Sequence, residues 1–170
     1  MSDLQVVAEA ELFERISAGD IVELTRAATA STYYRDDLTD EQVARNHAIV
    51  AMSGDTAVAA AIDPLRWVAG GFVRDRLAGF VLSTRHGPDD HELDWLMVHP
   101  DFHGTAASRT LMEAGMRWLG LDRPMWLTVL QFNTRAIGFY RRFGFEIDHT
   151  AVVKSVHANW IMRRLPGPLS

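Results

Sequence analysis

Residues 133–145 have the sequence NTRAIGFYRRFGF, and the organisation of the chain can be worked out from this stretch. Its apolar positions recur at the i, i+3, i+4, i+7 spacing of a helix that packs on a sheet. These positions are Ala136, Phe139, Tyr140 and Phe143. Such packing requires neither an asparagine at the start of the helix nor a tyrosine two turns later. Because about 3.6 residues make one turn, Asn133 and Tyr140 face the same side and can contact one elongated ligand.

The residues around this helix show helix and strand patterns in a definite order. Apolar residues at helical spacing predict helices at 21–35 and 38–52, with Thr39 as the cap of the second. Residues 53–65 fit helix, strand or loop equally well. Runs rich in β-branched and aromatic residues predict strands. The predicted strands are 5–10, 66–76, 76–86, 91–100, 124–130, 145–153 and 157–165, and the further helices are 133–144 and one that ends at Gly120.

This order of elements predicts a mixed α/β (or α+β) sheet with helices on both faces. The sequence contains no internal repeat and no linker, so we expect residues 1–170 to form a single domain. The last residues, 165–170, have the sequence LPGPLS and are expected to be a disordered tail.

The composition excludes several classes of function. A formal net charge of −5 argues against nucleic acid and membrane partners, and the absence of cysteine excludes a thiolate zinc site and a cysteine nucleophile. His91, His99 and His103 lack the spacing of metal ligands, so no metal is expected. The acidic N-terminus resembles no signal peptide, and no apolar run is long enough to span a membrane, so a cytoplasmic location is the default expectation.

A second informative stretch, VHPDFHGTAASR at 98–109, joins a predicted strand to a predicted helix. The N-terminus of a helix presents unpaired N–H groups and the positive end of the helix dipole, which together attract phosphate. The stretch therefore predicts either a phosphate-binding loop or the simple start of a helix.

The two stretches together resemble the signatures of the GNAT superfamily of acyl-CoA-dependent N-acetyltransferases. The pattern N-x-x-A-x-x-F-Y-x-x-x-G-F is complete between Asn133 and Phe145. The pattern L-x-V-x-P is present from Leu96 to Pro100, but the loop form Q/R-x-x-G-x-G/A is altered. In that loop the three differing positions are His103, Ala106 and Ser108. The resemblance covers roughly residues 65–163.

The resemblance implies a GNAT-like, mostly antiparallel sheet of six to seven strands and acetyl-CoA as co-substrate. It implies that the strand before the loop exposes its backbone to the pantetheine arm, that the loop binds the pyrophosphate, and that Asn133 bonds the pantetheine amide. Tyr140 would be the general acid that protonates the departing CoA thiolate. The implied cofactor-binding residues are Leu96, Met97, Val98, His103, Gly104, Thr105, Ala106, Ala107, Ser108, Arg109, Asn133, Phe139 and Tyr140.

The reaction also calls for a base, because an amine with a pKa near 10.4 is almost entirely protonated at pH 7. Glu92 and Asp94 are the candidates, since residues two apart on a strand share a face. We expect this strand to alternate Leu93, Trp95 and Met97 with a more polar face. A solvated strand edge is the alternative explanation for the two carboxylates.

The acceptor site is expected where the first two helices meet. An aromatic and acidic group there suits a small cationic amine, although an ordinary helix end explains the same residues. The acceptor can be a small molecule or a peptide, and a homodimer is one assembly that the resemblance allows. A catalytically degraded module that senses acyl-CoA or binds a protein is the alternative function, and a preference for a longer acyl chain is another. The candidate acceptor residues are Tyr33, Tyr34, Asp36, Asp37 and Trp67.

Overall fold

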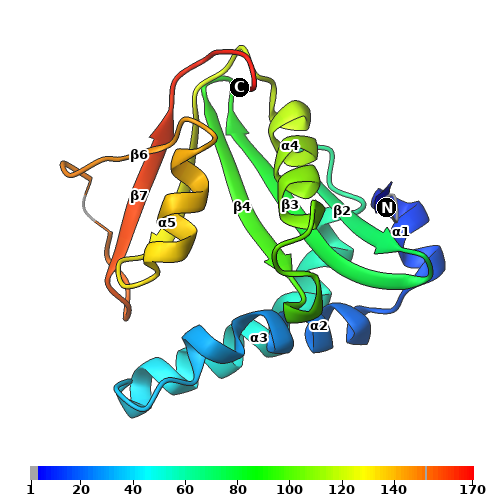
Figure 1. Cartoon of the computed structure of the whole chain (residues 1–170), viewed down its shortest axis with the longest axis horizontal. Coiled ribbons are helices and arrows are strands. Elements are labelled where there is room, and N and C mark those ends of the chain that lie inside the picture. The colour runs from blue at the N-terminus through cyan, green and yellow to red at the C-terminus, as the bar shows by residue number, and fades with distance from the viewer. Residues whose placement is uncertain (1–3, 152) are drawn as a thin grey trace.

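A computed structural model describes residues 4–151 and 153–170. These residues form a sheet of seven strands in the order β1-β2-β3-β4-β5-β7-β6, with helices on both faces (Figure 1). The strands are β1 (Leu4–Ala8), β2 (Arg66–Val73), β3 (Arg76–Gly87), β4 (Asp90–Val98), β5 (Met125–Leu130), β6 (Glu146–Ile147) and β7 (Asn159–Arg164). The helices are α1 (Glu9–Arg15), α2 (Ala18–Tyr33), α3 (Asp40–Ala60), α4 (Ala107–Leu119) and α5 (Thr134–Arg141), with a 3₁₀ turn η1 at Pro100–Phe102.

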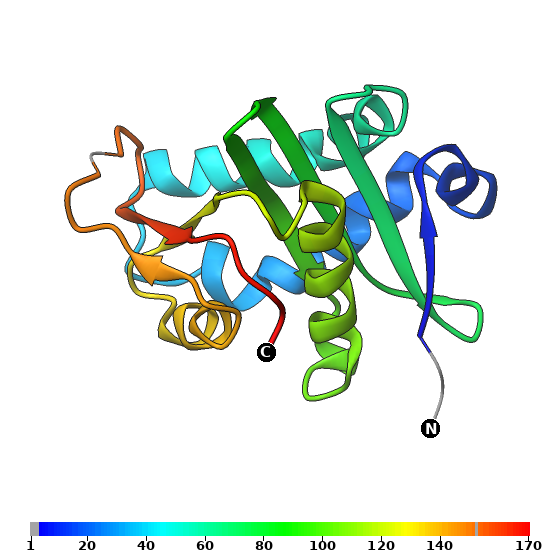
Figure 2. The ribbon, with the colours of Figure 1, turned by 90° about the horizontal axis from the view of Figure 1, so that it is seen from above.

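The sheet is mostly antiparallel, as the resemblance implied, and β4 and β5 form its parallel pair. β4 and β7 lean apart toward the C-terminal end of β4 (Figure 1). Seen from above, α4 lies over one face of the sheet, and α2 and α3 cross the other (Figure 2). Among the described residues, no helix is long and apolar enough to cross a membrane.

Each face of the sheet has its own hydrophobic core. The core under α4 and α5 includes Leu111, Met116 and Ile137, and the core under α1, α2 and α3 includes Leu12 and Ile21. Both α2 and α3 begin with a capping box. In the capping box of α3, the Thr39 side chain accepts from Gln42 N, and Thr39 is thus the expected cap. The undecided segment 53–65 begins as helix, because α3 continues to Ala60.

Two predicted strands end earlier than expected, and one helix was not predicted. The first strand ends at Ala8, because the chain turns at Glu9 with a φ of 56° and enters α1, which we did not predict. The strand predicted at 145–153 pairs with β7 only through Glu146 and Ile147. Asp148 then accepts from Thr150 N at 3.0 Å, which turns the chain away from the sheet. Residue 152 of that prediction lies outside the described residues.

The alternation predicted for β4 is also wrong, because the strand contains a bulge. Ser83 pairs with Leu93, but Leu82 pairs with Trp95, so the backbone of Asp94 has no pairing partner on β3. Leu93 therefore packs in the core under α4, whereas Trp95 and Met97 pack against the opposite core.

The C-terminal residues, expected to be disordered, lie against the body of the protein. Gly167 N donates to Leu121 O at 2.9 Å, and Leu169 packs on the core under α4. The Arg164 guanidinium donates to Gly167 O at 2.7 Å and to Pro168 O at 3.0 Å. A proline- and glycine-rich tail is therefore ordered by an arginine that precedes it.

Candidate active site

The sheet opens beside β4, and this opening positions the candidate site. β4 and β5 pair only through His91 with Met125 and through Glu92 with Trp126. Beyond Glu92, the backbone of β4 is paired with β3 on one edge and has no β5 pair on the other among the described residues. The segment 96–98, predicted to bind a pantetheine arm, lies on this unpaired edge. A ligand with amide groups can therefore add to the edge as a strand would.

The segment between β4 and α4 presents backbone donors at its end. Ala106 has φ −69° and ψ −8°, so it needs none of the left-handed conformation that a glycine would supply. A methyl group added at Gly104 would meet nothing within 4 Å, so the loop is open there. Four backbone N–H groups have no hydrogen-bond partner among the described residues, those of Gly104, Ala106, Ser108 and Arg109. They can bind an anion at the positive, N-terminal end of α4.

His103 links this loop to the elements on either side. Its Nε2 lies 3.2 Å from Val98 O at the end of β4, and its Nδ1 lies 3.5 Å from Nη1 of Arg135. Arg135 is in the first turn of α5, so its positive charge lies beside the loop. Sequence reasoning missed Arg135, because no pattern in the chain connects the start of α5 with a loop thirty residues earlier.

The start of α5 is capped by the asparagine that the sequence singled out. Asn133 Oδ1 accepts from Ala136 N at 3.2 Å, which leaves the side-chain NH₂ group for another acceptor. Gly144 has a φ of 86° just after the helix, as expected for a glycine that ends it.

Tyr140 lies two turns along α5 and is half-buried. Burial, with a smaller contribution from the neighbouring Tyr33, raises the pKa of Tyr140 to about 12. Its ring packs edge-on against Phe139 and Phe145 at centroid distances of 5.5 and 6.4 Å. Tyr140 therefore keeps its proton at neutral pH and can donate it.

The two candidate bases lie close together in a polar cluster. Glu92 Oε2 is 2.7 Å from Nε2 of His86, and its side chain is only 12% exposed, so it is no solvated strand edge. Burial, followed by the nearby Asp94, raises the pKa of Glu92 to about 6. Burial also raises the pKa of Asp94, against the opposing charge of Arg66. A carboxylate with a pKa of about 6 can accept a proton near neutral pH.

Sequence reasoning missed the partners of these carboxylates. His86 and Thr84, whose Oγ1 lies 3.4 Å from Asp94 Oδ2, come from β3, and Arg66 comes from β2. Which residues of β3 face β4 depends on the bulge at Asp94, and the sequence contains no signal for that bulge.

The predicted acceptor residues fall into two groups. Besides burial, the nearby Tyr33 raises the pKa of Tyr140, so Tyr33, the last residue of α2, lies near it. Tyr34 and Asp36 are exposed on the same chain segment, and Asp37 pairs with Arg35 at 2.6 Å. Trp67 does not join them, since it stacks on Trp118 at 6.2 Å in the layer under α4.

A groove of about 560 Å³ lies between the start of α3 and the loop before β7. Glu41, Arg45 and Lys154 line it, so it carries charges of both signs. Burial raises the pKa of Tyr33, and the charge of Arg45 opposes that rise, so this groove lies near Tyr33. No pattern in the sequence singled out Arg45 or Lys154, whereas Asp36 and Asp37 were the charged residues expected at the acceptor site.

Known proteins resemble the chain in sequence and in fold. An uncharacterized N-acetyltransferase of Mycobacterium tuberculosis is 35% identical over 92 residues, which cover 52% of this chain and 58% of that protein. A mycothiol acetyltransferase of Propionibacterium freudenreichii is 31% identical over 137 residues, 71% of this chain and 44% of its own length. The chain thus matches less than two thirds of the length of either relative.

The fold is similar to that of PaiA N-acetyltransferase from Thermoplasma acidophilum, solved in complex with coenzyme A. The TM-score is 0.73 at 17% identity, and the match covers 96% of this chain and 99% of that one. The model of the Acetyltransferase (GNAT) family matches residues 23–145, from α2 to the end of the α5 signature. The chain therefore belongs to the GNAT acetyltransferase family.

Proposed function

We propose that the protein is an acetyl-CoA-dependent N-acetyltransferase that transfers the acetyl group directly to an amine. The observation that carries the proposal is the unpaired edge of β4, which lies between a loop of open N–H groups and the helix of Asn133 and Tyr140. Membership of the GNAT family and relatives named N-acetyltransferase support an acyltransferase.

The proposed binding site for acetyl-CoA has three parts. The pyrophosphate would accept from the N–H groups between Gly104 and Arg109, next to the positive charge of Arg135. The pantetheine arm would add to the edge at residues 96–98. The helix cap uses only Oδ1 of Asn133, so its NH₂ group would form a hydrogen bond with an amide of the pantetheine arm.

The proposed reaction uses Tyr140 as the general acid. The amine nitrogen forms a bond to the thioester carbon, and the carbon–sulfur bond then breaks. The departing thiolate takes the phenol proton of Tyr140, which is present at pH 7 with the pKa at about 12. The nitrogen loses a second proton as it becomes an amide, and this proton restores the Tyr140 phenol.

Glu92 is the proposed base, with Asp94 beside it. The amine must lose a proton to attack, and Glu92 accepts one with a pKa of about 6. His86, at 2.7 Å, can pass the proton from Glu92 toward solvent, because its ring is 41% exposed. A water molecule between the amine and Glu92 would complete the route.

For the acceptor we propose a small molecule or peptide that carries an amine. Tyr33, Tyr34 and Asp36 suit a small cationic amine, as we expected from the sequence. The groove beside them also has Arg45 and Lys154, so an amine that carries a carboxylate fits equally well. A cytoplasmic location and a homodimer remain predictions.

A transfer assay tests the proposed function. The purified protein is mixed with acetyl-CoA and a panel of diamines, amino acids and short peptides, and release of free CoA thiol is measured. Thiol release that depends on an amine supports the enzyme, and the preferred amine separates the two acceptor classes. Binding of acetyl-CoA with no transfer to any amine would favour the degraded, acyl-CoA-sensing alternative.

A further inference from the structure

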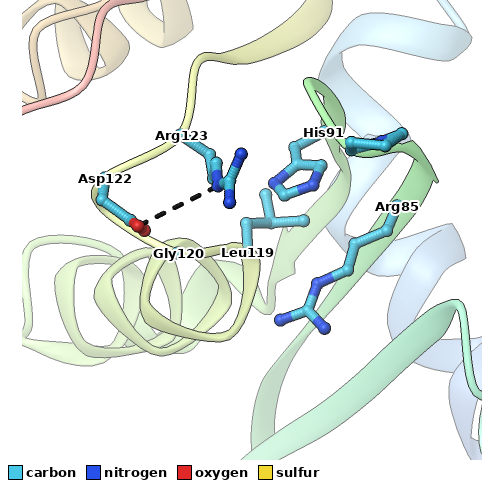
Figure 3. A pocket seen from close by; sticks show the side chains of 7 residues that line it. Arg85, His91, Leu119, Gly120, Asp122 and Arg123 are labelled. Carbon is cyan, nitrogen blue, oxygen red and sulfur yellow. Dashed lines mark ion pairs between the residues drawn. The ribbon is translucent and has the colours of Figure 1, made fainter.

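A second cavity lies at the other end of α4 from the proposed phosphate loop. Its volume is about 360 Å³, and its walls come from β3, β4 and the segment between α4 and β5. Figure 3 shows the His91 ring and the Arg123 guanidinium extending into it from opposite sides, with Leu119 between them and Arg85 below. The proposed transfer reaction uses none of these four side chains.

Arg85 has a positive charge without a matching carboxylate. Its guanidinium lies 4.1 Å from the centre of the Trp118 ring and donates to Trp118 O. Its Nε is buried without a hydrogen-bond partner among the described residues, and no carboxylate there comes within 4 Å of it. A partly buried positive charge without a negative charge beside it is costly, so an anion in the cavity would stabilise this arrangement.

His91 offers a second unpaired polar atom on the same wall. The residue is 5% exposed, and its Nδ1 has no hydrogen-bond partner in the described part of the chain. Arg85 and His91 are directly paired across β3 and β4, so their side chains lie next to each other on one face of the sheet. The two oxygens of one carboxylate can therefore bind the Arg85 and His91 side chains together.

The opposite wall limits the charge of the ligand. Arg123 lies 3.1 Å from Asp89 and 3.9 Å from Asp122, so its own charge is already matched. Of these two carboxylates Asp122 lines the cavity, and it repels a second negative charge there. Leu119 gives an apolar surface beside them. A ligand with one negative charge and a short apolar body fits this lining better than a phosphate dianion does.

We propose that this cavity is a binding site for a small monocarboxylate. Its carboxylate lies between Arg85 and His91, and its hydrocarbon part lies on Leu119. The site is separate from the proposed acetyl-CoA and acceptor sites, so it does not depend on the proposed function.

An NMR titration of the full chain with sodium butyrate tests the site, with sodium chloride used to hold the ionic strength constant. We expect saturable shifts of the Arg85 side-chain Nε–H signal and the His91 ring signals, with a Kd of about 1 mM or lower. Inorganic phosphate in a parallel titration should bind at least about tenfold more weakly. Shifts that stay linear up to about 50 mM butyrate, or phosphate that binds as tightly, would overturn the proposal.

Variants localise the binding. Arg85→Gln and His91→Gln should each weaken butyrate binding at least about tenfold, whereas Arg26→Gln, an exposed arginine on α2 paired with Glu23, should bind as the wild type does. Arg85→Lys keeps the charge over Trp118 but lacks the Nε–H donor, so it should also weaken butyrate binding, and it covers the case in which Arg85→Gln fails to fold. Unchanged affinity in both His91→Gln and whichever Arg85 variant folds would contradict the site.

Discussion

At the scale of single residues, the account depends first on the Tyr140 hydroxyl. Tyr140→Phe removes the proposed proton donor but keeps the ring that packs on Phe139 and Phe145. We expect kcat to fall about 10²-fold or more, within the range for loss of a general acid, while calorimetry finds the acetyl-CoA affinity nearly unchanged. Wild-type turnover in this variant would remove Tyr140 from the mechanism.

The pH dependence of the reaction depends on Glu92. Its carboxylate form is the active one, so kcat/KM should rise as the pH rises through about 6, the raised pKa of this group. Glu92→Gln should lower kcat/KM and abolish this rising limb. An unchanged limb in that variant would assign the titration to another group.

Asp94→Asn is the matched control for this profile. The negative charge of Asp94 raises the pKa of Glu92, so its removal should move the rising limb to a pH below that of the wild type. The direction of this shift separates an electrostatic neighbour from a second base, whose loss would lower activity without moving the limb.

The residues of the candidate site could be predicted only in part from the sequence. Asn133 and Tyr140 could be predicted, because both belong to one helix and the helical period sets their geometry. Arg135 and His86 could not, because each acts through a residue on another element, His103 or Glu92. Their placement depends on loop conformation and strand register, which no local pattern records.

At the scale of elements, two helical glycines should respond to alanine in opposite directions. A Cβ on Gly54 of α3 would lie 2.4 Å from Ala18 O at the start of α2, whereas a Cβ on Gly138 of α5 would meet nothing within 4 Å. Gly138→Ala should raise the free energy of unfolding by about 1 kcal/mol through helix propensity. Gly54→Ala should lower it by about 1–3 kcal/mol, because overpacking outweighs that gain.

Urea unfolding of both variants at one pH measures this difference. A stabilising effect at both positions would show that α2 and α3 approach each other less closely than described. A destabilising effect at both would mean that α5 tolerates no added methyl group.

The order of most elements followed from local patterns, and the exceptions have physical causes. The strands predicted at 66–76 and 76–86 were confirmed as β2 and β3, which pair as an antiparallel hairpin because two runs of β-branched and aromatic residues flank a short polar turn. The helix α1 was missed, because it is only seven residues long and buries mainly Leu12. The alternation of β4 failed at Asp94, where one extra residue exchanges the two faces of the strand.

At the scale of the whole molecule, the topology places three separately encoded parts around one opening. The loop before α4, the edge of β4 and the start of α5 meet because β4 and β5 are joined at one end only. Through the family resemblance the sequence implied all three, including the exposed edge of β4 at 96–98. No local pattern predicted that pairing with β5 stops after Glu92, since the number of paired residues between two parallel strands follows from packing on both faces.

The proposed function requires that the altered loop binds the pyrophosphate of acetyl-CoA. Isothermal titration calorimetry measures this binding, with Ala106→Asp and Ala106→Asn as a pair that differs by one charge at the start of α4. We predict micromolar affinity for the wild type, about −8 kcal/mol, little change for Ala106→Asn and at least about tenfold weaker binding for Ala106→Asp. No binding up to about 1 mM by the folded wild-type protein, or equal affinity in the two variants, would mean that the loop does not bind the pyrophosphate.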